Sequence, residues 1–424
     1  MRVGIIGGGI AGLTTAWLLD ESVGAGIDAI TLLEREHRLG GHAESVPVDD
    51  GFADLGAQHL APDAFPVHTR LLRRLGLDEG LIESPLSVTV TSGTAPVVTT
   101  PHPRLRPQPT GAAGNADLGH LNTFLARAAE LEQDPDAWYT PVGEIVEPLD
   151  IPDRFKREAV YPLLASFVGC SLEATRDLSF RAAVAFLVRN SPESPGQPPP
   201  WRNLDGGLGG LADSLAERLR NTRIRKGASV TRMRRTEHGH EITDSTGGTE
   251  TVDHVVFATP PDTARRLAAD SADPELDGVL RRFDFVRSVV GVHRDPTYVP
   301  SEPGLRSTNN ITVSERHRGT RWAETSTWYG PITGAQVFKS WLTHRDRLPT
   351  ELVTAREYHH PVPTVRNMRA QAVLEEIQGN DGLHCAGSWT VDVDSQESAV
   401  RSAVATARRI LPSAQRIKAL DDER

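Results

Sequence analysis

The chain has 424 residues, of which 38% are hydrophobic and 24% are charged, and its formal net charge is −10. This composition is typical of a soluble globular protein with room for two domains, and it excludes a disordered or fibrous chain. The acidic balance, without a basic stripe, argues against nucleic acid as a partner. With only two cysteines, Cys170 and Cys385, a disulfide framework is excluded, and no set of His, Asp and Glu has metal-ligand spacing, so no metal site is predicted.

The N-terminal 60 residues predict one βαβ unit. Arg2 to Ile6 is an apolar run suited to a buried strand, Leu13 to Asp20 has helical character, and Ala29 to Leu33 predicts a second strand that ends at Glu34. The apolar start could be mistaken for a signal peptide, but it lacks a basic leader and a cleavage-like site. No stretch has the apolar length of a membrane span, so we expect a cytoplasmic protein without one.

Helices and strands alternate through the rest of the chain. Helices are expected at 67–75, 118–131, 157–167, 180–188, 211–219 and 397–411. Strands are expected within 86–100, 224–233, 241–258 and 383–387, a mixed segment at 274–362, and a proline-rich loop at 191–200. There is no internal repeat.

The turn between the first strand and the first helix carries Gly7-x-Gly9-x-x-Gly12, followed by Glu34 at the end of the next strand. In that context the pattern predicts a dinucleotide site, because Gly7 allows a tight turn, Gly9 lets backbone N–H groups approach a pyrophosphate, and Gly12 lets the helix pack closely. Glu34 would accept hydrogen bonds from a ribose 2′-OH. The residues predicted to hold this half of the cofactor are Gly7, Gly9, Ile10, Ala11, Gly12, Glu34 and Arg35.

The glycine pattern of this loop does not distinguish NAD from FAD, but the residues that follow it do. The runs Glu34-Arg35-x-x-x-Leu39-Gly40-Gly41-His42 and Asp54-Leu55-Gly56-Ala57 resemble the flavin-dependent amine oxidase superfamily, which includes amine oxidases and phytoene-type desaturases. The C-terminal runs Gly382–Ser388 and Ser395–Ala399 add to the likeness. It is closest to a bacterial branch of predicted NAD/FAD-binding proteins, through Val292-His293-Arg294-Asp295 and Tyr358-His359-His360-Pro361.

The resemblance implies FAD as the cofactor and assigns further residues to it. Gly40, Gly41 and His42 would lie near the pyrophosphate, and the backbone of Val230 would meet the adenine. The segment Gly56, Ala57, Gln58 and His59 would run toward the flavin ring. Gly387 and Ser388 would contact the ribityl-pyrophosphate arm, and the helix start at Gln396, Glu397 and Ser398 would face the flavin pyrimidine. Ser388 departs from the acidic residue of many members, and Ser398-Ala399 departs from a common Gly-Ala or Asp-Gly pair.

We therefore expect an α/β protein with two interleaved domains. A Rossmann-like FAD-binding domain would comprise residues 1–60, 204–265 and 366–412. An α+β substrate domain with a mixed sheet and helices would comprise 61–203 and 266–365, with a C-terminal tail at 413–424. Gly207-x-Gly209-x-x-Ala212 fits a second nucleotide loop, but no strand is predicted before it, so we interpret it as a turn beside the flavin pocket. Without an NADPH domain, electrons would enter with the substrate and leave to oxygen or another acceptor.

The candidate catalytic residues are His42, Lys339 and His360. His42 could contact pyrophosphate, act on substrate, link covalently to flavin, or be structural. Lys339 could serve the flavin N5 through a water, as the resemblance suggests, but a surface position on an edge strand is the favoured interpretation. Neighbours on a strand face opposite sides, so at most one of His359 and His360 would enter the pocket.

Four aromatic residues could line an apolar cavity or belong to the core: Trp322, Trp328, Tyr329 and Trp341. His293 could face the pocket. The leading hypothesis is an FAD-dependent oxidase, dehydrogenase or desaturase that takes hydride from a C–N or C–C bond of a small molecule. The alternatives are a non-redox flavin isomerase and a flavin-free binding protein, as Rab GDP-dissociation inhibitors are on this scaffold. The substrate, the electron acceptor and the oligomeric state are not predicted.

Overall fold

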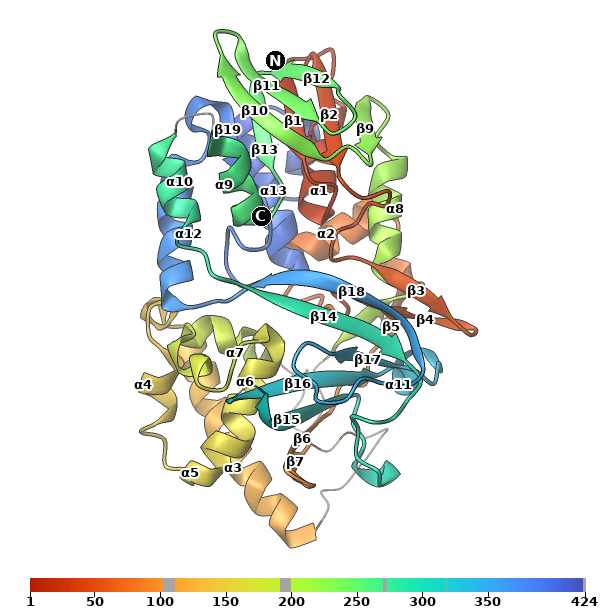
Figure 1. Ribbon diagram of the computed structural model, residues 1–424, viewed down its shortest axis with the longest axis vertical. Helices are drawn as coiled ribbons and strands as arrows, with labels where there is room; N and C mark the ends of the chain where they lie inside the picture. The colour runs from red at the N-terminus through yellow and green to blue at the C-terminus, as the bar shows by residue number, and fades with distance from the viewer. Residues whose placement is uncertain (101, 103–110, 191–199, 270–272, 318, 422–424) are drawn as a thin grey trace.

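The fold is α/β, as predicted, and most of its strands belong to two large sheets that lie one above the other in Figure 1. The computed structural model describes residues 1–100, 102, 111–190, 200–269, 273–317 and 319–421. Of the loop predicted at 191–200, all but the last residue lies outside these ranges. Within them, no helix combines the length and the apolar character that crossing a membrane requires.

A five-stranded parallel sheet forms the core of the upper half, in the order β19-β13-β1-β2-β9. Its strands come from three separate stretches of the chain: β1 (Arg2–Ile6) and β2 (Ala29–Glu34), then β9 (Thr222–Lys226) and β13 (His254–Phe257), and finally β19 (Leu383–Cys385). The central strands are apolar and buried, as expected where both faces of a parallel sheet are covered. The residue limits of the two predicted domains stay a prediction.

Both faces of this sheet are covered. One face packs on α1 (Ile10–Asp20), α2 (Pro66–Leu75), α8 (Gly209–Glu217) and α13 (Gln396–Ile410), which share one apolar core. The short α14 (Gln415–Lys418) adds Ile417 to the same core. The other face carries an antiparallel sheet and three helices: β10 (Val230–Thr236), β11 (Gly239–Asp244), β12 (Thr249–Val252), α9 (Pro261–Ala268), α10 (Pro274–Leu280) and α12 (Val365–Ile377).

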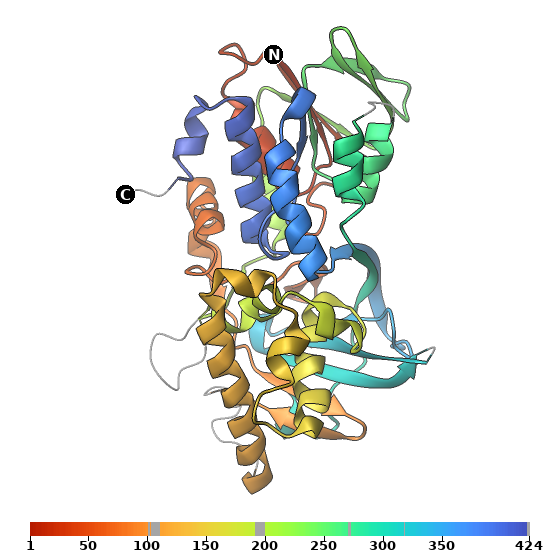
Figure 2. The ribbon, with the colours of Figure 1, turned by 90° about the vertical axis from the view of Figure 1, so that its left-hand side faces the viewer.

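A seven-stranded mixed sheet dominates the lower half, in the order β18-β14-β17-β16-β15-β6-β7. Its members are β6 (Val88–Ser92), β7 (Ala95–Thr99), β14 (Phe285–His293), β15 (Asn309–His317), β16 (Thr320–Trp328), β17 (Phe338–Trp341) and β18 (Leu352–Pro361). Among the described strands of this sheet, only β6 and β15 pair in parallel. In Figure 2 the long α3 (Gly111–Glu132) runs down one side of this half. It shares a core with α4 (Val142–Val146), α5 (Asp153–Phe155), α6 (Tyr161–Val168) and α7 (Phe180–Val188).

Short elements complete the described fold. Two small antiparallel ribbons are formed by β3 (Ser45–Val48) with β4 (Gly51–Asp54), and by β5 (Leu81–Glu83) with β8 (Arg202–Leu204), and α11 (Gly330–Thr333) precedes β17.

The helices predicted at 67–75 and 180–188 are confirmed to within one residue. The strand predicted at 224–233 is two strands in different sheets, because Gly227, at φ +67°, turns the chain between them.

Candidate functional site

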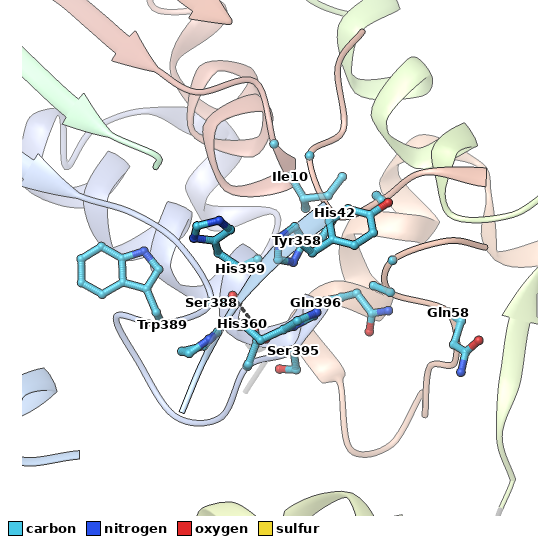
Figure 3. A pocket seen from close by; sticks show the side chains of 18 of the residues that line it. Ile10, His42, Gln58, Tyr358, His359, His360, Ser388, Trp389, Ser395 and Gln396 are labelled. Carbon is cyan, nitrogen blue, oxygen red and sulfur yellow. Dashed lines mark hydrogen bonds and ion pairs between the residues drawn. The ribbon is translucent and has the colours of Figure 1, made fainter. Parts of the chain in front are cut away.

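A cavity of about 1830 Å³ is lined by residues from both halves of the molecule. Pockets for one small ligand measure roughly 300–1,000 Å³, so this cavity has room for a cofactor and a substrate together. The predicted site residues that line it are Gly7, Gly9, Ile10, Ala11, Glu34, Arg35, Gly40, Gly41, His42, Gly56, Ala57, Gln58, His59, Val230, Lys339, His360, Gly387, Ser388 and Gln396. Figure 3 shows its histidine-rich part.

The glycine loop has the geometry that a pyrophosphate needs. Gly7 adopts φ +111°, and a Cβ there would overlap the carbonyl oxygen of Ala258. Gly12 does not line the cavity but presses against the carbonyl of Gly7, which lets α1 pack onto the sheet. A Cβ at Gly9 would meet nothing nearer than Gly41 Cα at 3.8 Å, so that side is open. Gly9 caps α1 without a side-chain hydrogen bond, and this leaves N–H groups free for an anion.

The carboxylate of Glu34 lies beside this loop, at the carboxyl end of β2. One of its oxygens accepts a hydrogen bond from the Gly8 N–H at 2.6 Å. Arg35 also reaches the cavity and forms an ion pair with Glu36 at 3.5 Å. Val230, the first residue of β10, lines the same region. Glu34 is therefore placed to accept from a ribose hydroxyl, as the sequence predicts.

The turn at Gly40 and Gly41 is hydrogen-bonded to the glycine loop at Gly7 to Gly12. The N–H of Gly40 donates to the carbonyl of Gly8 at 2.8 Å. The Arg38 guanidinium donates to the Gly41 carbonyl at 3.1 Å and forms an ion pair with the buried Glu44 at 2.8 Å. A network of charge-assisted hydrogen bonds thus fixes the position of this turn against the cofactor loop.

Lys339 is buried, contrary to the predicted surface position. It lies on β17, which is an interior strand of the large sheet, and its Nζ donates to the carbonyl of Gly56. Burial lowers the pKa of Lys339 and raises that of the nearby buried Asp54. The ammonium therefore fixes the Gly56 backbone at the cavity wall.

The residues after Gly56 are held by the large sheet and by β8. Gln58 donates to Thr327 at 3.2 Å and accepts from the buried Tyr329 hydroxyl at 3.1 Å. A ring nitrogen of His59 lies 2.9 Å from Asn203 Oδ1, and burial lowers the pKa of His59 to about 4. These contacts hold both side chains in place at the wall of the cavity.

Two of the predicted catalytic histidines, His42 and His360, lie together. Their ring centroids are 5.2 Å apart, and His42 also meets the edge of Tyr358 at 5.0 Å (Figure 3). Burial, followed by the charge of His360, lowers the pKa of His42 to about 4, so its imidazole is neutral at pH 7. His360 stacks on Trp341 at 5.0 Å and places Nδ1 3.4 Å from Asp394. His359 lines the cavity too, so the expectation that at most one of the pair would enter is wrong.

Ser388, which stands where many superfamily members have an acidic residue, is paired with one instead. Its hydroxyl donates to Asp394, six residues further on. The Gly387 N–H donates to Ser402 at 2.9 Å, which ties this turn to α13. Gln396, at the start of α13, lines the cavity beside His360 in Figure 3.

The structure places Glu397 and Ser398 outside this cavity. The Glu397 carboxylate accepts from the backbone N–H groups of Val67 and His68, at 3.2 and 2.8 Å, and so caps α2. The Ser398 N–H donates to the N-cap hydroxyl of Ser395 at 3.1 Å. Their roles are structural because both are used to fix helix ends.

Beyond the histidines the cavity widens into an apolar chamber between helices and the large sheet. Its apolar walls come from α3, α6, α7 and two strands of the sheet: Leu118, Leu121, Leu125, Phe167, Phe186, Val88 and Ile311. Of the four aromatic residues predicted as candidates, only Trp341 lines it. Tyr329 is fully buried in the core, and Trp322 stacks on His344 at 3.5 Å. His293 is buried against Ser340 at 2.8 Å and does not line the cavity.

The second glycine-rich loop is not a nucleotide loop. The short β8 precedes it, although no strand was expected, but β8 pairs with β5 and does not belong to the parallel sheet. Gly207 packs against Ser45 and Asp54, and the Gly209 N–H donates to the Ser45 hydroxyl at 2.9 Å. This packing fills the space that a phosphate would need.

A parallel sheet with a glycine loop at its carboxyl edge, and a cavity that continues into a second domain, define a dinucleotide-binding oxidoreductase. The family model of flavin containing amine oxidoreductases matches residues 10–293. The chain belongs to this family, whose typical cofactor is FAD, and the predictions of the superfamily, the cofactor and the enzyme class are confirmed.

Individual proteins are similar to the chain at different levels. Coproporphyrinogen III oxidase of Mycobacterium tuberculosis (strain ATCC 25618 / H37Rv) is 30% identical over 313 residues, which cover 68% of this chain but only 64% of that protein. The CLA-producing fatty acid isomerase from P. acnes has a TM-score of 0.67 at 14% identity, with 97% of this chain and 98% of that chain covered. Putrescine oxidase bound to putrescine has a TM-score of 0.63 at 15% identity, with 97% and 99% covered. The two structures show a shared fold.

Some residues at the site carry no signal that sequence reasoning could use. Asp394 lies in an irregular loop, and Glu44 follows the Gly40-Gly41-His42 turn without forming a motif of its own. Tyr358 precedes two histidines, and its residue type alone does not indicate a role at the site. Only the fold brings Asp394 and Tyr358 to the cavity, and it brings Glu44 into contact with Arg38 and Tyr358.

Proposed function

We propose that the chain uses FAD to take hydride from a C–N or C–C bond of a small organic molecule and passes the electrons to oxygen or another acceptor. The observation that supports this most strongly is the continuity of the cavity. It runs from the glycine loop and Glu34, past Gly56 and Gln396, into the apolar chamber. A cofactor that spans the first part would present its flavin ring to a substrate in the second.

The residues present fit FAD. The open side of Gly9 and the uncapped start of α1 suit a pyrophosphate, and Glu34 suits a ribose hydroxyl. Gly56, held by Lys339, and Gln396 at the N-terminus of α13 would flank the ring. When bound, the flavin would supply a hydride acceptor at N5, and the helix N-terminus would favour negative charge on the reduced ring.

The chamber favours a substrate with an apolar body. Leu118, Leu121 and Leu125 form one face of α3, and Phe167 and Phe186 approach each other at 6.1 Å on α6 and α7. Apolar walls with a few polar groups are typical of sites for small molecules. Oxidation of a porphyrinogen is a second candidate, which the name of the 30% identical relatives favours.

The first test is the absorption spectrum of the purified protein, with mass spectrometry of the ligand released by acid. We expect a flavin spectrum and free FAD. Colourless protein that cannot be reconstituted with FAD would refute the proposal and favour a binding protein. Flavin that stays with the precipitate would instead show a covalent link.

The second test compares three compounds taken from the names of the similar proteins: coproporphyrinogen III, putrescine and a long-chain unsaturated fatty acid. Each is mixed anaerobically with the holoenzyme. Bleaching of the flavin band by one of them identifies the bond that is oxidised. Conversion of the fatty acid without oxygen consumption or net bleaching would favour an isomerase. As a control, Leu125→Arg, which places a charge in the chamber, should weaken the reaction, whereas Gly278→Ala on the remote α10 should not.

A further inference from the structure

His360 is held in the cavity by contacts on two sides. It lies near the end of β18, and its ring stacks on the Trp341 indole with 5.0 Å between centroids and 24° between planes. Its Nδ1 lies 3.4 Å from Oδ2 of Asp394, and the other oxygen of that carboxylate accepts from the Ser388 hydroxyl. All four residues line the cavity.

This pairing fixes which nitrogen of His360 carries the proton. An ionised carboxylate can only accept a hydrogen bond, so it selects the tautomer with hydrogen on Nδ1 and leaves the lone pair on Nε2. Within the described residues, Nε2 has no hydrogen-bond partner, and the side chain retains 17% of its exposure. A carboxylate that holds one nitrogen of an imidazole, while the other nitrogen keeps an open lone pair, is the arrangement of a general base.

Hydrogen bonds act to keep the carboxylate ionised. Burial acts to raise the pKa of Asp394, but the hydrogen bonds from His360 and Ser388 act in the opposite direction, and the pKa is lowered overall. Of the two histidines, His360 is the one whose ring nitrogen lies within hydrogen-bond distance of Asp394.

We propose that His360 is a catalytic proton acceptor positioned by Asp394, and that the site therefore dehydrogenates a C–C bond. The inference rests on the proposed function. One carbon would lose hydride to flavin N5, its neighbour would lose a proton to Nε2 of His360, and a C=C bond would form. The substrate is oxidised by two electrons, FAD is reduced, the proton passes to solvent, and dioxygen or another acceptor reoxidises the flavin.

Oxidation of an amine and dehydrogenation of a C–C bond differ in whether the hydride step needs a base. A neutral amine forms C=N with its own nitrogen lone pair as the hydride leaves, so no base is needed at that step. A carbon has no lone pair, and its proton must be accepted as the hydride departs. A positioned imidazole beside the apolar chamber suits the second reaction.

The test uses 1-nitrohexane and its preformed nitronate as probes. The neutral compound must lose a proton from its α-carbon before it can deliver electrons to flavin, whereas the nitronate has already lost it. With dithionite-reduced holoenzyme in D₂O no oxidation can occur, and exchange of the α-hydrogens followed by ¹H NMR reports proton abstraction alone.

We compare the wild type with His360→Gln, Asp394→Asn and the matched control His238→Gln, which changes an exposed histidine in the β10–β11 turn. We expect exchange to fall by about 100-fold or more in His360→Gln and by at least about tenfold in Asp394→Asn. The control should match the wild type. The nitronate should still bleach the oxidised flavin in every variant that binds FAD.

The role of Asp394 has its own readout. In ¹⁵N-histidine-labelled protein, the His360 signal, identified by its loss in His360→Gln, should show hydrogen on Nδ1. In Asp394→Asn the hydrogen should move to Nε2 in at least part of the molecules. A purely structural role would leave the tautomer unchanged. If His360→Gln fails to fold, the His360 signal is assigned instead by its loss in His360→Asn.

Three results would overturn the inference: no exchange by the wild type above the buffer rate, exchange in a flavin-loaded His360→Gln variant within twofold of the wild type, or an unchanged tautomer in Asp394→Asn. Failure of the proposed function looks different. In that case neither nitrohexane nor its nitronate bleaches the wild-type flavin, or no flavin is bound at all.

Discussion

His68 lies on α2 with its ring fully buried, and neither ring nitrogen has a hydrogen-bond partner among the described residues. Burial lowers its pKa from 6.5 to about 4. A histidine whose folded-state pKa is depressed favours folding above its unfolded pKa, and that contribution is lost as the pH falls from 6.5 toward 4. Between pH 7 and pH 5 the unfolded chain takes up roughly 0.7 of a proton at this site, while the folded chain takes up roughly 0.1. The resulting loss is roughly 2 kcal/mol.

The assay is urea unfolding of the holoenzyme at pH 7 and pH 5, for the wild type, His68→Leu and the exposed control His238→Leu. Carboxylates also titrate in this range, but they contribute equally to all three proteins and cancel in the difference. We expect His68→Leu to lose roughly 2 kcal/mol less than the wild type on acidification, and the control to lose as much as the wild type. If the free energies of wild type and His68→Leu fall in parallel, the buried imidazole is not neutral and the reasoning fails.

Further variants test the cofactor loop and the buried ion pair. Gly9→Val should fold but lose bound FAD, because its side chain would occupy the space left for pyrophosphate, whereas Gly278→Ala, which faces open space on α10, should keep it; flavin absorbance per protein measures both. Arg345→Met removes the partner of buried Glu324, 3.3 Å away, and should cost about 3 kcal/mol of unfolding free energy at pH 8. Since burial raises the pKa of Glu324 to about 7, the cost should shrink at pH 5, where the carboxyl is protonated, and Arg345→Met/Glu324→Leu should recover most of it.

The cofactor half of the site could be predicted because local sequence determines its geometry. Gly7 and Gly12 are required wherever a backbone carbonyl occupies the place of a Cβ, so their spacing carries information that does not depend on the rest of the chain. Glu34 follows from the length of one βαβ unit. The sequence also predicts the start of the helix at Gln396. The resemblance does not indicate that the Glu397 side chain caps α2.

The position of Lys339 could not be predicted because it depends on distant strands. The residue pattern from Val337 to Trp341 is compatible with an edge strand and with an interior strand alike. β17 is interior because β14 and β16 hydrogen-bond to its two sides, and those strands begin and end elsewhere in the chain. The sequence leaves the aromatic residues open between cavity and core for a similar reason, since only the topology shows that Tyr329 packs in the core and that Trp341 lines the cavity.

Local sequence determines the residues at the cofactor, whereas distant strands determine the residues at the substrate chamber. The cofactor is therefore easier to predict than the substrate. The chamber is built from leucine and phenylalanine side chains that would look the same in an ordinary core. Chemical selectivity must then come from the few polar groups that reach it, and among these the His360–Asp394 pair combines an ionised carboxylate with an open imidazole nitrogen. The family's fold positions the flavin, but a base in this place constrains which bond can be broken. The substrate is therefore better sought among molecules with two adjacent C–H bonds than among those that share only the relatives' names.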